Sequence, residues 1–265
     1  MKNPSDSWWL KLKRAEKHLS DLNDYAAGFS EIWPYDTTLD VHAQEDRTDY
    51  IVRAFFRDPP DYTPAIIIGD FIHNIRSALD HIVAALTEPP ELREQSAFPI
   101  YEENIWQEGF KAQRKAFKTA TKGLPDYALA FVKQIQPYGR GQDAIRDPLA
   151  LLKKFSNDDK HRQLIVTTRG IRQPTTTLRW PNGPILSQSQ FGDTFEDGAV
   201  VAKFPVAGPP SDTEPRVHTH GPIAIAIKGG GTAYGGDFEL PSALENILKY
   251  VWEYVILPLD TFVPS

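Results

Sequence analysis

One segment of the chain carries an unusual density of polar side chains that can take part in chemistry. At 100° per residue, five of its polar positions fall along one stripe of a helix: Asp70, His73, Asn74, Ser77 and His81. Arg76 and Asp80 are four residues apart and form a neighbouring polar row. A plain surface helix more often carries Lys and Glu, so this stripe is a candidate site. The alternative is a polar face that is solvated or hydrogen-bonded to other helices.

A second polar cluster follows a short predicted helix and precedes a predicted strand. Its candidate residues are Asn157, Asp159, Lys160, His161 and Arg162. Complementary donors and acceptors at the boundary between two elements are typical of binding and catalytic sites. The alternative is a helix C-cap at Asn157 with cations near the negative end of the helix. We expect the two clusters to lie within hydrogen-bonding or one-water reach of each other.

The elements that must position these residues follow from apolar periodicity. Spacings of three and four residues predict helices at 6–30, 65–87, 104–121, 127–135 and 148–155. Alternating, β-prone residues predict a hairpin near 38–57 and short strands at 164–168, 175–180, 185–190, 199–204 and 223–227.

The order of these elements predicts an α+β fold, in which a helical bundle carries a small antiparallel β-sheet. Residues 1–160 form its mainly helical part and residues 161–232 its β-rich part. A C-terminal helix at 240–258 returns to the bundle. We therefore expect residues 1–265 to form a single interlocked unit.

Composition narrows the function classes. Apolar residues make up 41% and charged residues 24%, as in an ordinary globular protein. The chain has no Cys, which excludes disulfides, thiolate zinc sites and a cysteine nucleophile. It has no run of 18 apolar residues, so no transmembrane helix and no membrane partner are expected. With no secretory signal at its start, a cytoplasmic location is expected.

Charge is distributed unevenly along the chain. Residues 1–110 hold 10 basic and 20 acidic side chains, whereas residues 111–172 hold 14 basic and 5 acidic. A basic middle segment between acidic ends predicts either an RNA-binding surface or an internal charge match between segments. Its basic side is concentrated on the predicted helix 104–121, at Lys111, Arg114, Lys115, Lys118 and Lys122.

The segment Arg76-Ser77-Ala78-Leu79-Asp80-His81 reads as Arg, four residues, His on a helix, which resembles the motif of the HEPN superfamily. Members of that superfamily include metal-independent endoribonucleases of toxin–antitoxin and phage-defence systems. The resemblance covers the helices of residues 1–160. It implies that Arg76 and His81 act on the scissile phosphate, in a cleft at the interface of a homodimer, with no metal and no cofactor.

In that hypothesis His81 or His161 transfers the proton, because histidine titrates near neutral pH. Arg76, with Lys160 or Arg162, stabilises the charge on the phosphorane, and Asp80 or Asp159 orients a histidine. Two other hypotheses stay open. One is a metal-dependent hydrolase or oxygenase using Asp70, His73, His81, Asp159 and His161. The other is a non-enzymatic binding or assembly module with a buried polar network.

Overall fold

The chain divides into two compact units that differ in secondary structure. The structure is a computed structural model, and it describes residues 6–31, 35–57, 63–160, 167–171, 175–181, 183–189, 198–220, 223–227 and 240–263. Unit 1 comprises Met1–Leu22, Thr63–Ile165 and Pro241–Ser265. Unit 2 comprises Asn23–Tyr62 and Val166–Leu240. Helices and antiparallel sheets together confirm the α+β prediction.

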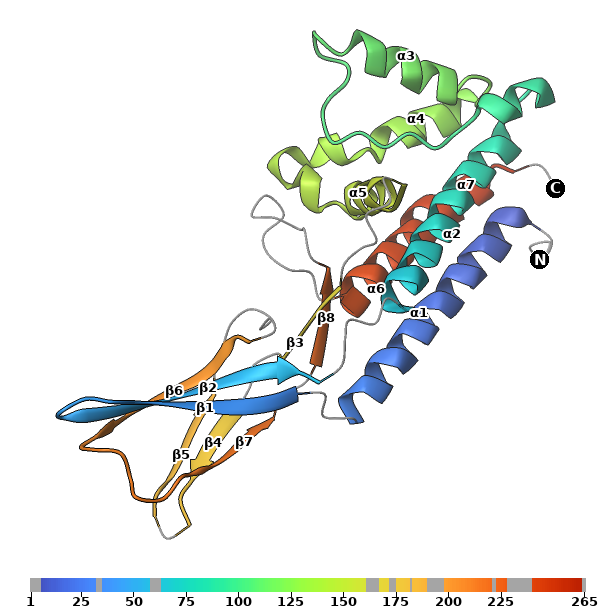
Figure 1. Cartoon of the computed structure of the whole chain (residues 1–265). Coiled ribbons are helices and arrows are strands. Elements are labelled where there is room, and N and C mark those ends of the chain that lie inside the picture. Colours follow the sequence, from blue (N-terminus) through green and yellow to red (C-terminus); the bar gives the residue numbers. More distant parts are fainter. Residues whose placement is uncertain are drawn as a thin grey trace. The chain divides into compact units, whose positions relative to one another are not determined.

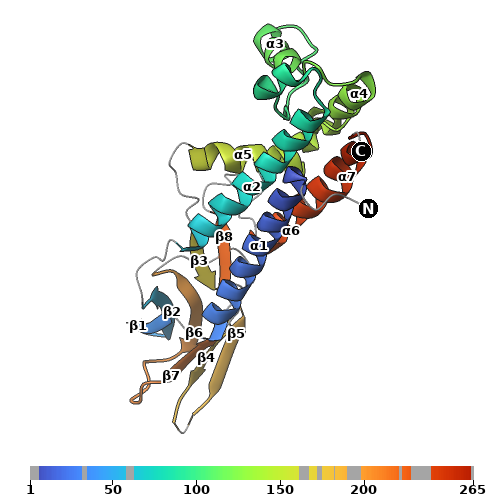
Figure 2. The same cartoon turned by 90° about the vertical axis from the view of Figure 1, so that its right-hand side faces the viewer.

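Unit 1 is built on long helices that lie side by side (Figures 1 and 2). They are α1 (Ser7–Glu31, which belongs to unit 1 as far as Leu22), α2 (Thr63–Leu86) and a C-terminal run formed by α6 (Leu240–Tyr250), a π-helical turn (Val251–Ile256) and α7 (Leu257–Asp260). The apolar seams explain this packing. Every residue of the predicted core face of α2 is buried: Phe71, Ile72, Ile75, Leu79, Ile82 and Leu86. No helix in the described ranges is both long and apolar enough to cross a membrane.

The C-terminal run returns to the first helix, as the sequence predicts. The indole Nε1 of Trp8 donates a hydrogen bond of 3.2 Å to Asp260 Oδ1. The rings of Trp9 and Trp252 lie 4.4 Å apart between centroids. One face of the C-terminal run is fully buried, at Leu244, Ile247, Val251, Val255 and Leu259. These contacts join residues that are about 250 positions apart in the chain.

Shorter elements complete unit 1. They are α3 (Lys111–Ala120), α4 (Asp126–Gln134), α5 (Pro148–Lys160) and two 3₁₀ segments, Pro90–Gln95 and Pro137–Arg146. α5 packs on α2.

The prediction of a helix over 104–121 was wrong at its start. Residues 101–110 form turns, and Gly109 adopts a φ of +91°, which a continuing helix does not allow. The Arg114 guanidinium stabilises this irregular segment by donating to the carbonyls of Ile105 and Gln107.

Unit 2 contains two three-stranded antiparallel sheets and one strand pair. The first sheet has the order β1 (Tyr35–Ala43), β2 (Arg47–Phe56), β6 (Val200–Ala207). The second has the order β5 (Ile185–Ser189), β4 (Thr175–Arg179), β7 (Arg216–His220). β3 (Thr167–Ile171) pairs with β8 (Ile223–Ile227). The predicted hairpin is confirmed as β1–β2, and its pairing with β6 places it among the later strands.

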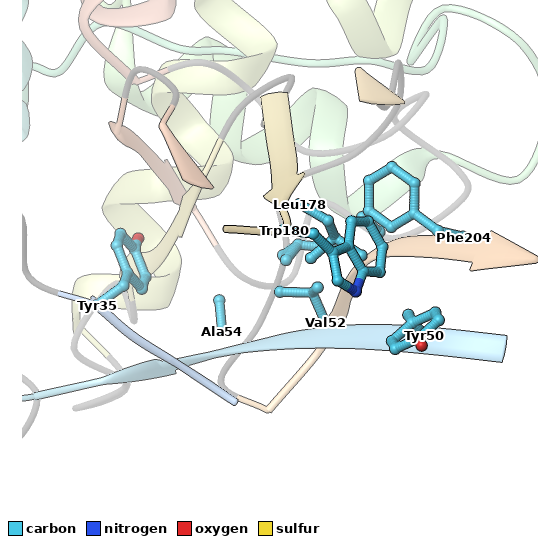
Figure 3. Close-up of a cluster of buried hydrophobic side chains, with 9 residues drawn as sticks. Tyr35, Tyr50, Val52, Ala54, Leu178, Trp180 and Phe204 are labelled. Carbon is cyan, nitrogen blue, oxygen red and sulfur yellow. The ribbon is translucent and has the colours of Figure 1, made fainter. Parts of the chain in front are cut away.

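The core of unit 2 lies between the two sheets (Figure 3). Tyr50 and Val52 of β2 meet Leu178 of β4 and Trp180, and Phe204 of β6 closes the cluster. The ring of Tyr50 lies edge-on to that of Trp180, with centroids 5.3 Å apart. Buried and exposed residues alternate along β4, and along β6 from Ala202 onward, which fixes the side of each strand that faces outward.

The chain passes from one unit to the other several times, since each unit is assembled from separate segments. That residues 1–265 fold as one interlocked unit stays a prediction, which truncation of the chain tests.

Candidate functional site

α2 carries the Arg76–His81 motif on the part of the helix that adjoins residues 97–100. Asp80 Oδ1 accepts hydrogen bonds from Arg76 Nη2 at 3.1 Å and from the backbone N–H of Phe98 at 2.9 Å. Arg76 Nη2 also donates to the carbonyl oxygen of Phe98. Two side chains one helical turn apart thus bind both polar groups of one backbone residue. We call this arrangement the Arg76–Asp80 clamp.

Burial and charge act on Arg76 in opposite directions. Burial of the guanidinium lowers the pKa of Arg76, while the Asp80 carboxylate raises it. Arg76 remains cationic at neutral pH, because an arginine begins far above that range. The clamp therefore holds a charged guanidinium in a fixed orientation with 21% of its side-chain surface exposed.

The polar stripe on α2 is present, and its members differ in environment. Asp70 and His73 are exposed, Ser77 and His81 are half-buried and Asn74 is buried. The Asn74 amide donates a hydrogen bond of 2.7 Å to the carbonyl oxygen of Asp70 on the same helix. The side chains of His73 and His81 make no hydrogen bond within the described ranges, and Asp80 bonds to Arg76 and Phe98 rather than to His81.

A histidine that the sequence analysis missed lies beside the first turns of α2. His18 of α1 is 6% exposed. Burial lowers its pKa and the charge of Arg14 lowers it further, whereas Asp70 and Asp21 raise it. Asp70 is thus close enough to act electrostatically on His18. The signal in the sequence is that position 18 falls within the buried seam of α1, between Ala15 and Leu19.

Asp159 of the second polar cluster lies against α2. A Cβ placed on Gly69 would lie 2.9 Å from Asp159 Oδ1, so the carboxylate of Asp159 lies directly over the glycine. The neighbouring Asp158 pairs with Lys154 at 3.1 Å, and Asn157 is exposed. Lys160 ends α5, but its side chain lies outside the described residues, as do His161 and Arg162. The predicted contact of His161 with the α2 stripe therefore stays a prediction.

Across the described ranges, no three His, Asp or Glu side chains come together closely enough to hold a metal ion. His161, which the metal-dependent hypothesis uses, lies outside those ranges.

The basic residues of α3, together with Lys122 directly after it, form a continuous surface in unit 1. A hollow of about 490 Å³ is lined by Lys111, Arg114, Lys115, Lys118, Thr119 and Lys122. Its four lysines are exposed, and none of them pairs with a carboxylate of the described residues. Like charges three and four residues apart on a helix repel each other, so α3 maintains this row at a cost in stability.

An apolar hollow adjoins the basic one. It has a volume of about 300 Å³ and shares Lys118 and Lys122 with its neighbour. Trp106, Phe117, Leu124 and Leu129 supply its apolar lining. Trp106 is 40% exposed, and Lys133 Nζ lies 5.1 Å from its ring centroid. We call the two hollows together the α3 surface.

The α3 surface and the clamp are connected through the backbone. Ala97 precedes Phe98, and its N–H donates a hydrogen bond of 3.1 Å to the carbonyl oxygen of Ala120 at the end of α3. Gly123 O accepts a hydrogen bond from the N–H of Glu88, just after α2. The lysine row therefore ends close to the segment that Arg76 holds.

Comparisons of the chain with protein-family models, with curated proteins and with solved structures return no match. None of the three comparisons therefore assigns the chain to a family.

Proposed function

We propose that the protein binds single-stranded RNA through the α3 surface. The observation that supports this most is the row of four exposed lysines beside a hollow lined by Trp106 and Phe117. Lysines contact successive phosphates, and an apolar hollow accepts an unstacked base. A duplex keeps its bases stacked, so the combination favours a single strand. The choice of RNA over DNA rests on the resemblance of the Arg76–His81 motif to the HEPN superfamily.

The test measures affinity for a labelled RNA of about ten nucleotides by fluorescence anisotropy. The double variant Lys115→Ala/Lys118→Ala removes two exposed cations from the row. For single strands each lost phosphate contact reduces the slope of log affinity against log salt by about 0.7, so the slope should fall by about 1.4.

The matched control is Lys17→Ala/Lys249→Ala, which removes the same charge from exposed positions of α1 and α6. It should leave affinity and salt slope close to those of the parent. Equal losses in both double variants, or no RNA binding by the parent, would refute the proposal.

A second candidate function is metal-independent cleavage of the bound RNA, as in a HEPN-like endoribonuclease. The observation that favours it is that Arg76 bonds the carbonyl of Phe98, while the adjacent Ala97 bonds the carbonyl of Ala120, which lies between Lys118 and Lys122. In this proposal Arg76 stabilises the charge on the phosphorane, and His81 or His161 transfers the proton of the 2′-hydroxyl.

Cleavage in EDTA, leaving 2′,3′-cyclic phosphate ends and sparing DNA, is the expected outcome, because the 2′-hydroxyl is the nucleophile. His81→Ala should lower the cleavage rate roughly 10²- to 10⁴-fold while RNA affinity changes little. An EDTA-sensitive activity, or a His81→Ala variant as active as the parent, would remove this candidate and leave RNA binding standing. A homodimer is part of this candidate, and light scattering at micromolar concentration tests it.

A further inference from the structure

The outward face of the β5–β4–β7 sheet in unit 2 carries hydroxyls and cations. Thr176 and Leu178 of β4 are buried, so Thr175, Thr177 and Arg179 lie on the opposite face. The antiparallel register aligns this outward set with residues of both neighbouring strands: Arg216 and His218 of β7, and Ser187, Ser189 and the exposed Ile185 of β5. The pairs Thr175–Ser189 and Thr177–Ser187 are hydrogen-bonded through their hydroxyls.

Two arginines are directly opposite each other on this face. Arg179 pairs with Arg216 in the register of β4 and β7. Directly opposed side chains of an antiparallel pair start from Cβ atoms about 4.5–5.5 Å apart, and like charges at such positions are destabilising. Within the described residues, neither guanidinium has a carboxylate partner.

The other sheet of the same unit treats its arginines differently. Arg53 of β2 pairs with Asp40 of β1 at 3.0 Å, and Arg57, directly after β2, pairs with Asp36 of β1 at 2.8 Å. Asp49 receives both Arg47 and Lys203. Carboxylates thus neutralise arginines on the first sheet of this unit, whereas Arg179 and Arg216 have no such partner among the described residues.

A hollow of about 720 Å³ lies over the arginine pair. Among the described residues its lining is Thr177, Arg179, Trp180, Pro181, Arg216, Val217 and His218, with no acidic side chain. Trp180 also belongs to the core between the two sheets (Figure 3), and β4 is the central strand of its sheet. Arg179 therefore extends from a strand that is held in place by the core and by a neighbouring strand on each side.

We propose that this hollow binds the phosphate group of a small phosphate ester. Two guanidinium forks match the charge and the several oxygens of a dianionic phosphate, whereas one fork already satisfies a carboxylate. The volume lies within the range of about 300–1,000 Å³ typical of small-molecule sites, so an organic group attached to the phosphate also fits. The bound anion removes the repulsion between Arg179 and Arg216.

Titration calorimetry of the full chain with inorganic phosphate, at ionic strength held constant with chloride, tests the proposal. Arg179→Gln and Arg216→Gln should each weaken phosphate binding at least about tenfold, because each removes hydrogen bonds to a charged group. Arg57→Gln, an exposed arginine of the same unit, is the matched control and should bind like the parent. Without phosphate, Arg216→Gln should melt no lower than the parent, since it relieves the like-charge contact.

Two competitors identify the source of the phosphate: glycerol phosphate and a 5′-phosphorylated oligonucleotide, each beside its dephosphorylated form. Displacement of inorganic phosphate by the first supports a small-molecule ester, and displacement by the oligonucleotide alone overturns that choice. The Lys115→Ala/Lys118→Ala variant should keep phosphate binding, which separates this site from the α3 surface. The proposal fails if the parent shows no binding at a phosphate concentration of about 10 mM, which is roughly ten times a millimolar Kd. It also fails if both arginine variants bind like the parent.

Discussion

Replacing Asp80 by Ala should destabilise unit 1 far more than an ordinary helix ion pair would predict. The carboxylate accepts hydrogen bonds from Arg76 and from the N–H of Phe98, a residue that is fully buried. A hydrogen bond to a charged group contributes about 1.5–3 kcal/mol net. Because 35% of the Asp80 side chain and 21% of Arg76 are exposed, water replaces part of that loss. We expect a decrease of about 2–3 kcal/mol in the free energy of unfolding.

Urea unfolding followed by far-ultraviolet circular dichroism measures this change, since the signal reports the helices of unit 1. Asp80→Asn keeps an acceptor for Phe98 and should lose about half as much. A double-mutant cycle with Arg76→Met should give a coupling of about 1–2 kcal/mol.

The exposed pair Lys17–Asp21 has the same i, i+4 spacing on α1 and serves as the control. Asp21→Ala should have no measurable effect on unfolding. A loss below about 0.5 kcal/mol for Asp80→Ala, typical of a surface substitution, would show that the clamp does not hold residues 97–100.

Three further predictions concern the backbone, pH and chain length. Gly123→Ala should reduce the free energy of unfolding by well over about 2 kcal/mol, because the new Cβ would meet the Glu88 carbonyl oxygen at 2.4 Å. Gly109→Ala has free space around its Cβ and should lose about 1 kcal/mol from its positive φ alone. Thermal melting compares the two variants. Burial lowers the pKa of His18, so the stability that its neutral form provides is present above the ordinary pKa of 6.5 and is lost as pH falls below it. His18→Gln should flatten the dependence of the free energy of unfolding on pH in that range. An unchanged slope of the free energy against pH would contradict this. Deleting residues 241–265 should abolish folding of the whole chain, and a cooperative melt of the truncated chain would disprove the single-unit prediction.

Local periodicity was sufficient to predict the long helices and the hairpin. The core face of α2 and the return of the C-terminal run both follow from apolar residues at spacings of three and four. The start of α3 was predicted too early because Trp106 and Phe110 continue a helical spacing. A positive φ at Gly109 and the bonds from Arg114 override it.

The candidate site could be predicted only in part, because side-chain partners depend on tertiary structure. Arg76 and Asp80 were visible as a pair four residues apart, but their shared partner is a backbone segment 18–22 residues further along. The opposition of Arg179 and Arg216 depends on the register of β4 and β7, which the spacing of 37 positions does not reveal.

The hydrogen bond between Trp8 and Asp260 has a consequence for biosynthesis. Its two residues are 252 positions apart, and translation adds about 5–20 residues per second. For some tens of seconds α1 exists on the ribosome without the helix that covers Trp8 and Trp9. During that time the end of α1 that carries Trp8 and Trp9 lacks its C-terminal partner, and transiently exposed apolar surface of this kind makes a partly folded chain prone to aggregation. Moving the C-terminal run ahead of α1 by circular permutation would remove that delay.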